Sequence, residues 1–256
     1  MRRTALVTGG GRGIGAAIAV ALATAGFDVA IASGEREDEA GDTLARVRAA
    51  GARILYCEYD ISRIEQHRGL LERIRRDLGD LYCLVNNAGV TSLRRGDLLD
   101  LTPESFDRTL GINLRGTYFL TQAIAKDMLE RSESTPLGYR SIINISSANA
   151  EIVGADRADY CLSKAALSMM SKLYAVRLAA AGIHVFEVRP GIIRTGMTEP
   201  ATARYDRLIE EGEVPLRRWG VPADVGVAVA TLADGRIPFA TGEIVNVGGG
   251  LHLHRV

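Results

Sequence analysis

The sequence predicts an α/β fold, with one doubly wound parallel sheet of about seven strands and helices on both of its faces. Three observations lead to this fold class. Apolar segments of strand length alternate with segments of helix length, which is typical of parallel sheets covered by helices. The predicted strands are apolar at successive positions, as expected where both faces of a sheet are buried. A cluster of glycines separates the first strand from the first helix.

Seven short apolar segments, each bounded by glycine or polar residues, are predicted to be strands. They cover residues 4–8, 28–32, 53–57, 81–85, 141–145, 183–188 and 243–247. Pro190 and Gly191 follow the sixth segment and are expected to break it.

Helices are predicted over residues 16–25, 37–50, 62–78, 103–131, 160–178 and 222–233. Gly51 would end the second helix, and Thr102 would cap the fourth, with Pro103 in its first turn. The polar residues 132–138 are predicted to form a loop. Residues 195–216 show no clear period and are expected to be a mobile substrate loop. The sequence shows no repeat and no linker, so residues 1–256 are expected to form a single domain.

Composition excludes several classes of protein. The 256 residues are 47% hydrophobic and 24% charged, with a formal net charge of +0, which favours a large core and no nucleic-acid partner. There is no secretory signal and no apolar run long enough to span a bilayer, so we expect a cytoplasmic protein without membrane contact. His252 and His254 lack a partner cluster, and the three cysteines are dispersed, so no metal is expected.

Tyr160 and Lys164 are the first candidates for chemistry. Four residues apart on a predicted helix, they lie on one face and point into the same volume. A free phenol has a pKa of roughly 10, which a neighbouring ammonium lowers, so the pair can exchange protons near neutrality. Taken alone, the same spacing is common among surface residues. The other motifs, beginning with Ser146 and Ser147 upstream, favour the catalytic interpretation.

Further candidates follow the carboxyl ends of predicted strands, where ligands of such sheets bind. They are Gly9, Asp60, Asn87, Ser147 and Pro190. The glycines within residues 9–15 would let the backbone turn tightly and approach a pyrophosphate at a helix N-terminus. A plain tight turn would need similar residues, so the position between strand and helix is what favours a phosphate site.

In this order and spacing, the motifs resemble those of the short-chain dehydrogenase/reductase family over essentially the whole chain. The matching residues are Thr8-Gly9-Gly10-Gly11-Arg12-Gly13-Ile14-Gly15, Asn86-Asn87-Ala88-Gly89, Asn113, Ser147, Tyr160 with Lys164, and Pro190-Gly191 with Thr195. The resemblance implies a single Rossmann-type domain that interconverts a ketone and a secondary alcohol with NAD(P)(H). Within the family, the chain is most similar to proteins named 3-oxoacyl-(acyl-carrier-protein) reductases.

The resemblance also implies catalytic roles. Tyr160 would exchange the proton, while Ser147, favoured over Ser146 by the family spacing, would hold the carbonyl oxygen. Lys164 would lower the tyrosine pKa and bind ribose, and Asn113 would hold a relay water. An asparagine inside a helix could instead bond a backbone carbonyl, and a local helix distortion would allow both.

The cofactor contacts that the resemblance implies are spread over the strand ends. They are Gly9, Arg12, Gly13, Ile14, Gly15, Ser33, Asp60, Ile61, Asn87, Ala88, Gly89, Tyr160, Lys164, Pro190, Gly191, Ile193 and Thr195. An acid at the end of the second strand usually marks NAD, and here that position carries Ser33. With Arg12 and Arg36 nearby, NADP(H) is expected to be preferred and NAD(H) to be possible. Glu35 and the acids after it could still reach the ribose.

The substrate remains open between a carbonyl linked to an acyl carrier and a small molecule such as a polyol or sugar acid. The pocket is expected to use Thr91, Ser92, and residues 149–153 and 196–216. Basic residues that could meet an acidic carrier are Arg94, Arg95, Arg157, Arg204 and Arg207. An epimerase or dehydratase on the same scaffold, or a non-enzymatic nucleotide sensor, are the alternatives. The helices from Pro103 and Tyr160 are apolar on more than one face, and the resemblance implies a homotetramer.

Overall fold

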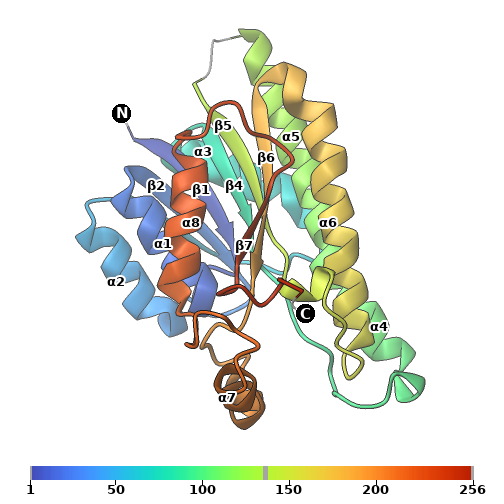
Figure 1. Cartoon of the computed structure of the whole chain (residues 1–256). Coiled ribbons are helices and arrows are strands. Elements are labelled where there is room, and N and C mark those ends of the chain that lie inside the picture. Colours follow the sequence, from blue (N-terminus) through green and yellow to red (C-terminus); the bar gives the residue numbers. More distant parts are fainter. Residues whose placement is uncertain (1, 135–137, 255–256) are drawn as a thin grey trace.

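Seven parallel strands form one sheet in the computed structural model, which describes residues 2–134 and 138–254 (Figure 1). The sheet order is β3-β2-β1-β4-β5-β6-β7. The strands are β1 (Arg3–Thr8), β2 (Phe27–Ser33), β3 (Ile54–Glu58), β4 (Leu81–Asn86), β5 (Arg140–Ile145), β6 (Ile183–Pro190) and β7 (Ile244–Val247). The order runs outward in both directions from β1 and β4, which confirms the predicted doubly wound sheet and places its switch point between these two strands.

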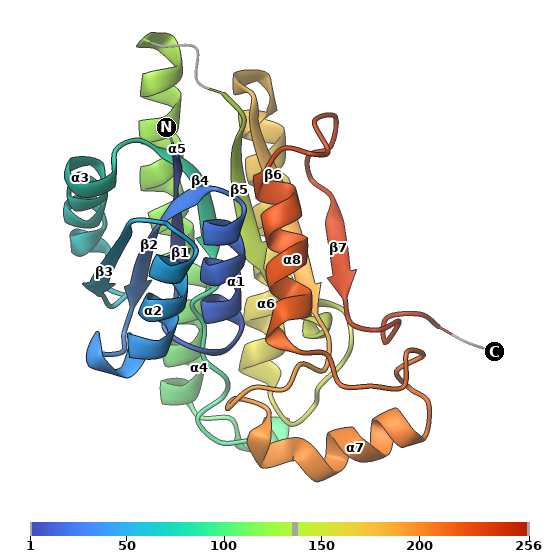
Figure 2. The same ribbon diagram turned by 90° about the vertical axis from the view of Figure 1, so that its left-hand side faces the viewer.

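Helices cover both faces of the sheet (Figure 2). One layer contains α1 (Gly13–Thr24), α2 (Gly41–Ala49) and α8 (Pro222–Ala233), and the other contains α3 (His67–Leu78), α5 (Thr117–Ser134) and α6 (Ala158–Leu178). Short 3-10 turns, Asp38–Ala40 and Ile64–Gln66, precede α2 and α3 in place of the longer helices predicted there. Every residue of β2 is buried, as expected for a strand covered on both sides.

The helix predicted over residues 103–131 is divided into three parts. It comprises α4 (Pro103–Leu110), a π-helical turn (Gly111–Gly116) and then α5. The Thr102 hydroxyl accepts the backbone N–H of Ser105 at 3.3 Å, as its predicted capping role requires. The helix continues to Ser134, so the predicted loop is wrong for residues 132–134, because polar residues are compatible with the last turn of a helix. Residues 135–137 of that loop lie outside the described residues.

The predicted substrate loop contains regular structure that its sequence pattern did not reveal. Residues 202–210 form α7 (Thr202–Glu210), beyond the carboxyl ends of the strands (Figures 1 and 2). Tyr205 and Ile209, one helical turn apart, pack with Ile192 and Val214 in a small core of their own. The expectation of an irregular segment over residues 195–216 is therefore wrong for this helix. In the described parts of the chain, no helix is long and apolar enough to cross a membrane.

Candidate active site

The glycine turn lies at the switch point, where α1 begins. Gly9 and Gly13 have φ angles of 62° and 57°, which side-chain-bearing residues rarely adopt. The first turn of α1 has no acidic residue, and Arg12 at its N-cap makes no side-chain capping bond. The N-terminal N–H groups of α1, around Ile14 and Gly15, therefore suit a pyrophosphate, so the turn fits a dinucleotide.

Asn87 fixes the glycine turn against β4. Its side-chain amide donates to the carbonyl oxygens of Thr8, at 2.9 Å, and Gly9, at 3.0 Å. The Thr8 hydroxyl accepts the backbone N–H groups of Asn87 and Ala88, both at 3.0 Å. These four bonds make the turn and the start of the next loop one rigid unit.

The loop after β6 faces the glycine turn from the other side. The N–H of Gly191 donates to the carbonyl of Val247 at 3.0 Å, and a Cβ on Gly191 would lie 2.6 Å from the Cα of Gly248. Only glycine fits where these two backbones meet. Further along, the Cγ2 of Thr195 lies 3.7 Å from the position that a Cβ on Gly13 would take. The predicted residues Pro190, Gly191, Ile193 and Thr195 thus lie on the segment that runs from the end of β6 to Gly13 of the glycine turn.

The hydroxyl of Ser147 lies close enough to Tyr160 to lower the pKa of its phenol. The Nζ of Lys164 lies 5.6 Å from the centroid of the Tyr160 ring and donates to the carbonyl of Ile145 at 3.0 Å. Ser146, the alternative serine, points away, because its hydroxyl donates to the buried Glu187 at 2.5 Å. The structure therefore brings Ser147, and not Ser146, to the tyrosine–lysine pair.

Asn113 lies in the π-helical turn, so the local distortion considered from the sequence is present. Its Oδ1 accepts the N–H of Val90 at 2.8 Å, while its Nδ2 donates to the carbonyl of Val90 at 2.9 Å and to Ser163 at 3.0 Å. A Cβ on Gly89 would lie 3.2 Å from Oδ1 of Asn113 and 3.5 Å from Nζ of Lys164. Gly89 therefore leaves the space between these two side chains open.

Burial shifts the pKa values of both central groups. It lowers the pKa of Lys164 to about 8, against a weaker opposing effect of Glu187. Burial also raises the pKa of Tyr160, and the Ser147 hydroxyl and the charge of Arg157 only oppose that rise. The predicted lowering of the tyrosine pKa by Lys164 is therefore wrong for the protein without cofactor, because desolvation outweighs the nearby charges. At neutral pH the phenol therefore holds its proton and is ready to donate it.

The predicted adenosine end of the site contains an acid beside the phosphate turn. Ser33 ends β2, is 4% exposed and donates to Glu35 at 3.4 Å. Glu35 forms an ion pair with Arg12. Asp60 accepts bonds from the backbone and side chain of Ser62, so it acts as an ordinary turn residue here, and the next residue, Ile61, is buried.

Asp159 is a polar residue of the site that the sequence did not single out. It is fully buried and accepts the hydroxyls of Ser105, at 2.7 Å, Thr109, at 2.9 Å, and Ser92, together with the backbone N–H of Tyr160 at 2.8 Å. It ties α4 and the loop at Ser92 to the backbone of Tyr160. Its position next to Tyr160 was the one available signal.

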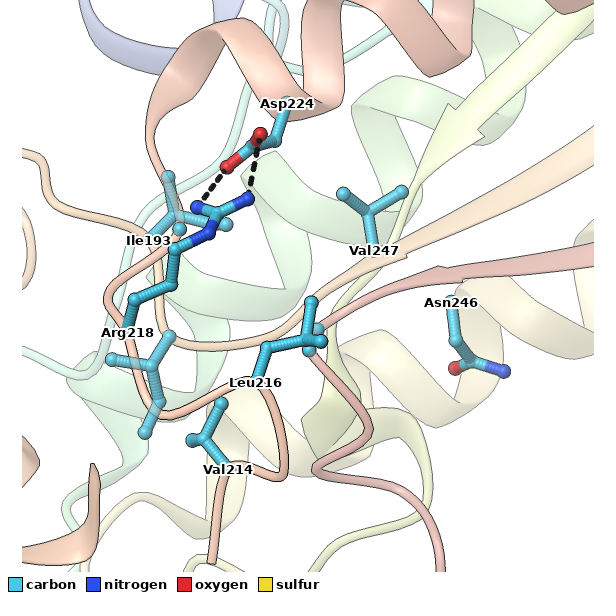
Figure 3. A pocket seen from close by; sticks show the side chains of 11 residues that line it. Ile193, Val214, Leu216, Arg218, Asp224, Asn246 and Val247 are labelled. Atoms are coloured by element: carbon cyan, nitrogen blue, oxygen red, sulfur yellow. Dashed lines mark hydrogen bonds and ion pairs between the residues drawn. The ribbon is translucent and has the colours of Figure 1, made fainter. Parts of the chain in front are cut away.

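A separate pocket of about 300 Å³ lies nearby (Figure 3). Its lining includes Ile193 and Val214, and Arg218 closes part of it by binding both carboxylate oxygens of Asp224, at 2.8 and 3.1 Å. Asn246 points away from this pair (Figure 3). Among the residues that the structure describes, the four catalytic candidates do not line this pocket. It is therefore distinct from the region where Tyr160 and Ser147 meet.

The parallel sheet, its glycine turn and the tyrosine–lysine pair beyond its strand ends define a nicotinamide-dependent oxidoreductase. Residues 9–252 match the family model described as enoyl-(acyl carrier protein) reductase. The chain belongs to the short-chain dehydrogenase/reductase family, as the resemblance implied.

Three relatives illustrate the range of similar proteins. The crystal structure of a 3-oxoacyl-[acyl-carrier protein] reductase from Brucella melitensis in complex with NAD is 45% identical, with a TM-score of 0.95, and covers 100% of this chain and 99% of that one. The acetoacetyl-CoA reductase of Rhizobium meliloti is 35% identical over 256 residues, 99% of this chain and 100% of that protein. A candidate 2-deoxy-d-gluconate 3-dehydrogenase from Agrobacterium tumefaciens, solved with bound NADP, is 31% identical, with a TM-score of 0.84, over 97% and 96% of the two chains. These relatives support a nicotinamide cofactor without choosing between NAD and NADP.

Proposed function

We propose that this oxidoreductase interconverts a ketone and a secondary alcohol at Tyr160. The observation that carries the proposal is the grouping of Ser147 and Lys164 around the phenol of Tyr160, with the glycine turn within the same group of strand ends. A bound nicotinamide supplies or accepts the hydride. The residues of the chain then supply the proton and hold the oxygen that receives it.

The proton moves at the Tyr160 hydroxyl, which donates to the carbonyl oxygen in reduction and accepts from the alcohol in oxidation. Ser147 holds the same oxygen by a hydrogen bond. Lys164 binds the cofactor ribose and stabilises the phenolate that remains after proton donation. Asn113, fixed at Val90, holds a water that reconnects Lys164 to solvent.

The substrate of first choice is a 3-oxoacyl group, since relatives with the names of 3-oxoacyl-carrier and acetoacetyl-CoA reductases span the full chain. The second candidate is a small polyol or sugar acid, which the gluconate-type relative favours. In either case residues 1–256 act as one domain, in the cytoplasm, with residues 195–216 covering the substrate. Four copies assemble through the apolar faces described below.

The choice of cofactor depends on Glu35. Ser33 supports the NADP(H) preference expected from the sequence, but the ion pair of Glu35 with Arg12 opposes it. A carboxylate beside the turn repels a 2′-phosphate and neutralises the arginine that would bind it, whereas it can accept bonds from an unphosphorylated ribose. We therefore propose that NAD(H) is used at least as well as NADP(H), with Glu35 at the ribose.

Tyr160→Phe tests the catalytic assignment. We expect turnover to fall by roughly 10²–10⁴-fold, because general acid catalysis is lost, while binding of NAD(H) measured by fluorescence is retained. Tyr174→Phe is the matched control, since Tyr174 lies on the same helix and donates to the carbonyl of Tyr118 at 3.2 Å. Substrates are screened as ketones and alcohols with each nicotinamide. Turnover in a folded Tyr160→Phe enzyme equal to that of the control would disprove the assignment.

A further inference from the structure

Arg157 connects three segments around the proposed catalytic centre. It directly precedes α6, and its side chain is 13% exposed. Its guanidinium carbon lies 5.9 Å from the centroid of the Tyr160 ring, and its Nη1 donates to the hydroxyl of Tyr205 on α7 at 3.3 Å. A Cβ on Gly154 would lie 2.8 Å from its Nε, so the loop after Ser147 also packs against it. A buried cation is thus placed where the substrate segments meet the reacting phenol.

This corner of the site has more positive than negative charge. Arg95, Arg157 and Arg204 all form ion pairs with the same carboxylate, Asp156, at 3.6, 3.8 and 3.1 Å. The Nε of Arg157 is buried and has no hydrogen-bond partner among the described residues. Three guanidiniums share one carboxylate, so a second anion would be attracted by the excess of positive charge here.

Tyr205 is sensitive to the same excess charge. Burial alone would raise its pKa, but the guanidiniums of Arg157 and Arg95 outweigh that effect and lower the pKa below the ordinary value for tyrosine. The hydroxyl of Tyr205 is therefore a strong hydrogen-bond donor beside Arg157. Together they form a site with both charge and a directed hydroxyl, which is what anion recognition requires.

We propose that Arg157 and Tyr205, with Arg95 and Arg204 at the rim, bind a carboxylate of the substrate. The inference rests on the proposed function and, of its two candidate substrates, favours the second over the 3-oxoacyl thioester: a short oxo or hydroxy acid, in which the carboxylate is a few bonds from the reacting carbon. Because the guanidinium lies this close to Tyr160, it can bind only a carboxylate that is a few bonds from the reacting carbon. It offers that carboxylate two parallel N–H bonds. A 3-oxoacyl thioester presents a neutral group at the same place, so it would leave Arg157 with only its share of the Asp156 carboxylate.

A structural role for Arg157 is the alternative, with the side chain holding the Gly154 loop, α7 and the face of the Tyr160 ring together. The two roles predict different kinetics. A structural arginine affects charged and neutral substrates alike, and so does any influence of its charge on the pKa of Tyr160. A substrate-binding arginine affects only the substrates that carry the anion.

The experiment compares matched ketones with and without a carboxylate: acetoacetate against ethyl acetoacetate, and 5-dehydro-D-gluconate against L-sorbose. We expect wild-type kcat/KM to be higher for the acid in at least one pair by roughly tenfold or more. In Arg157→Met, kcat/KM for that acid should fall by roughly 10–100-fold, the usual effect of losing a charge-assisted bond, while the neutral partner changes by less than about threefold. Arg157→Lys should retain part of the selectivity. Arg68→Met, on the exposed side of α3, is the control.

Arg204→Ala is a second test that still applies if Arg157→Met fails to fold, because the Arg204 side chain is 56% exposed and its loss should not disturb folding. It should reduce selectivity for the acid in the same direction and by a smaller factor. Acids that react no better than their neutral partners in wild type, or an equal loss for both partners in Arg157→Met, would overturn the inference and leave ketone reduction intact. A preference for dihydroxyacetone phosphate over every acid would overturn the carboxylate assignment. Failure of the proposed function has a different signature, with neither acids nor neutral ketones reacting with either nicotinamide.

Discussion

The carboxylate of Glu35 forms an ion pair with Arg12 across the glycine turn. Arg12 is otherwise open to solvent, with 85% of its side chain exposed, and Glu35 is the acid that lies two residues beyond the end of β2. The pair places a negative charge where the sequence alone had suggested a phosphate-binding arginine. We therefore expect the balance between NAD(H) and NADP(H) to depend on the side chain of Glu35.

Replacing Glu35 with glutamine should shift cofactor preference toward NADP(H). Two unit charges about 4 Å apart repel by roughly 4 kcal/mol at an effective dielectric near 20. Solvent weakens this, so we expect the ratio of kcat/KM for NADP(H) over NAD(H) to rise by roughly tenfold or more. Glu37→Gln is the control, because Glu37 is exposed and has no such pairing with Arg12 among the described residues. A wild type that prefers NADP(H), and loses that preference in Ser33→Asp, would show that Ser33 decides.

Lys164 should give the protein a pH-dependent stability. Burial lowers its pKa from 10.5 to about 8 in the folded state. Between these pH values the unfolded chain binds a proton that the folded chain does not, so the free energy of unfolding rises with pH. The destabilisation caused by burying the charged Lys164 is therefore at its full value only below about pH 8. Lys164→Met should be more stable than wild type by about 3 kcal/mol below pH 8, and this difference should vanish near pH 10.5.

Urea unfolding of both proteins without cofactor, at several pH values from 7 to 10.5, measures that difference. Lys172→Met, an exposed position on the same helix, should show no such convergence with pH. Parallel curves for wild type and Lys164→Met would mean that Lys164 keeps its proton in the folded protein.

Asp159→Asn should weaken both stability and turnover. Burial raises the pKa of Asp159, but the hydrogen bonds from Ser92, Ser105 and Thr109 outweigh it and lower the pKa, so the side chain is ionised at neutral pH. An amide replaces one acceptor oxygen with a donor and leaves a buried hydroxyl unsatisfied, at a cost of about 1–3 kcal/mol. We expect kcat to fall because Tyr160 is held less firmly, with little change in KM for the cofactor. Asp107→Asn, exposed on α4, is the control, and a kcat equal to that of this control would refute a positioning role.

The exposed apolar stripe of α6 should hold subunits together. Met169, Leu173 and Val176 are 55%, 60% and 84% exposed, whereas Leu167 and Met170 of the same helix are buried in the core. Such a stripe is unusual on a monomer's surface. Light scattering should show a tetramer for wild type and a smaller species for Leu173→Glu/Val176→Glu. The prediction fails if wild type is monomeric at micromolar concentration.

Local signals in the sequence were enough for most of the fold. The helix α8 has the predicted bounds, because Pro222 favours its first turn and the Asp224 carboxylate accepts the N–H of Val221 at 2.8 Å. The helix α7 was missed since only Tyr205 and Ile209 mark its buried side, and the cluster that covers them comes from Ile192 and Val214, distant in the chain. Tertiary contacts of this kind leave little trace in a short segment.

In the candidate site, too, some residues could be predicted from local sequence, and others could not because they depend on tertiary contacts. The placement of Tyr160 beside Lys164 and that of the glycine turn before α1 could be predicted, because each depends on short spacings within one turn or helix. Asp159 and Arg157 depend on partners from α4, α7 and the loop at Ser92, which only the folded chain brings together. Without knowledge of these partners, the sequence does not distinguish such a carboxylate or guanidinium from an ordinary surface group.

The π-helical turn at Gly111–Gly116 restricts which insertions and deletions the sequence can accept at this position. A π-helical turn holds more residues than an α-helical one, so a single-residue deletion here could close into an ordinary α-helix and leave the core face of α5 in place. Such a deletion would nevertheless move Asn113 away from the backbone of Val90, which its side chain now contacts through both Oδ1 and Nδ2. We therefore expect that a deletion within these six residues lowers turnover even where the fold tolerates it, because Asn113 loses its position at Val90.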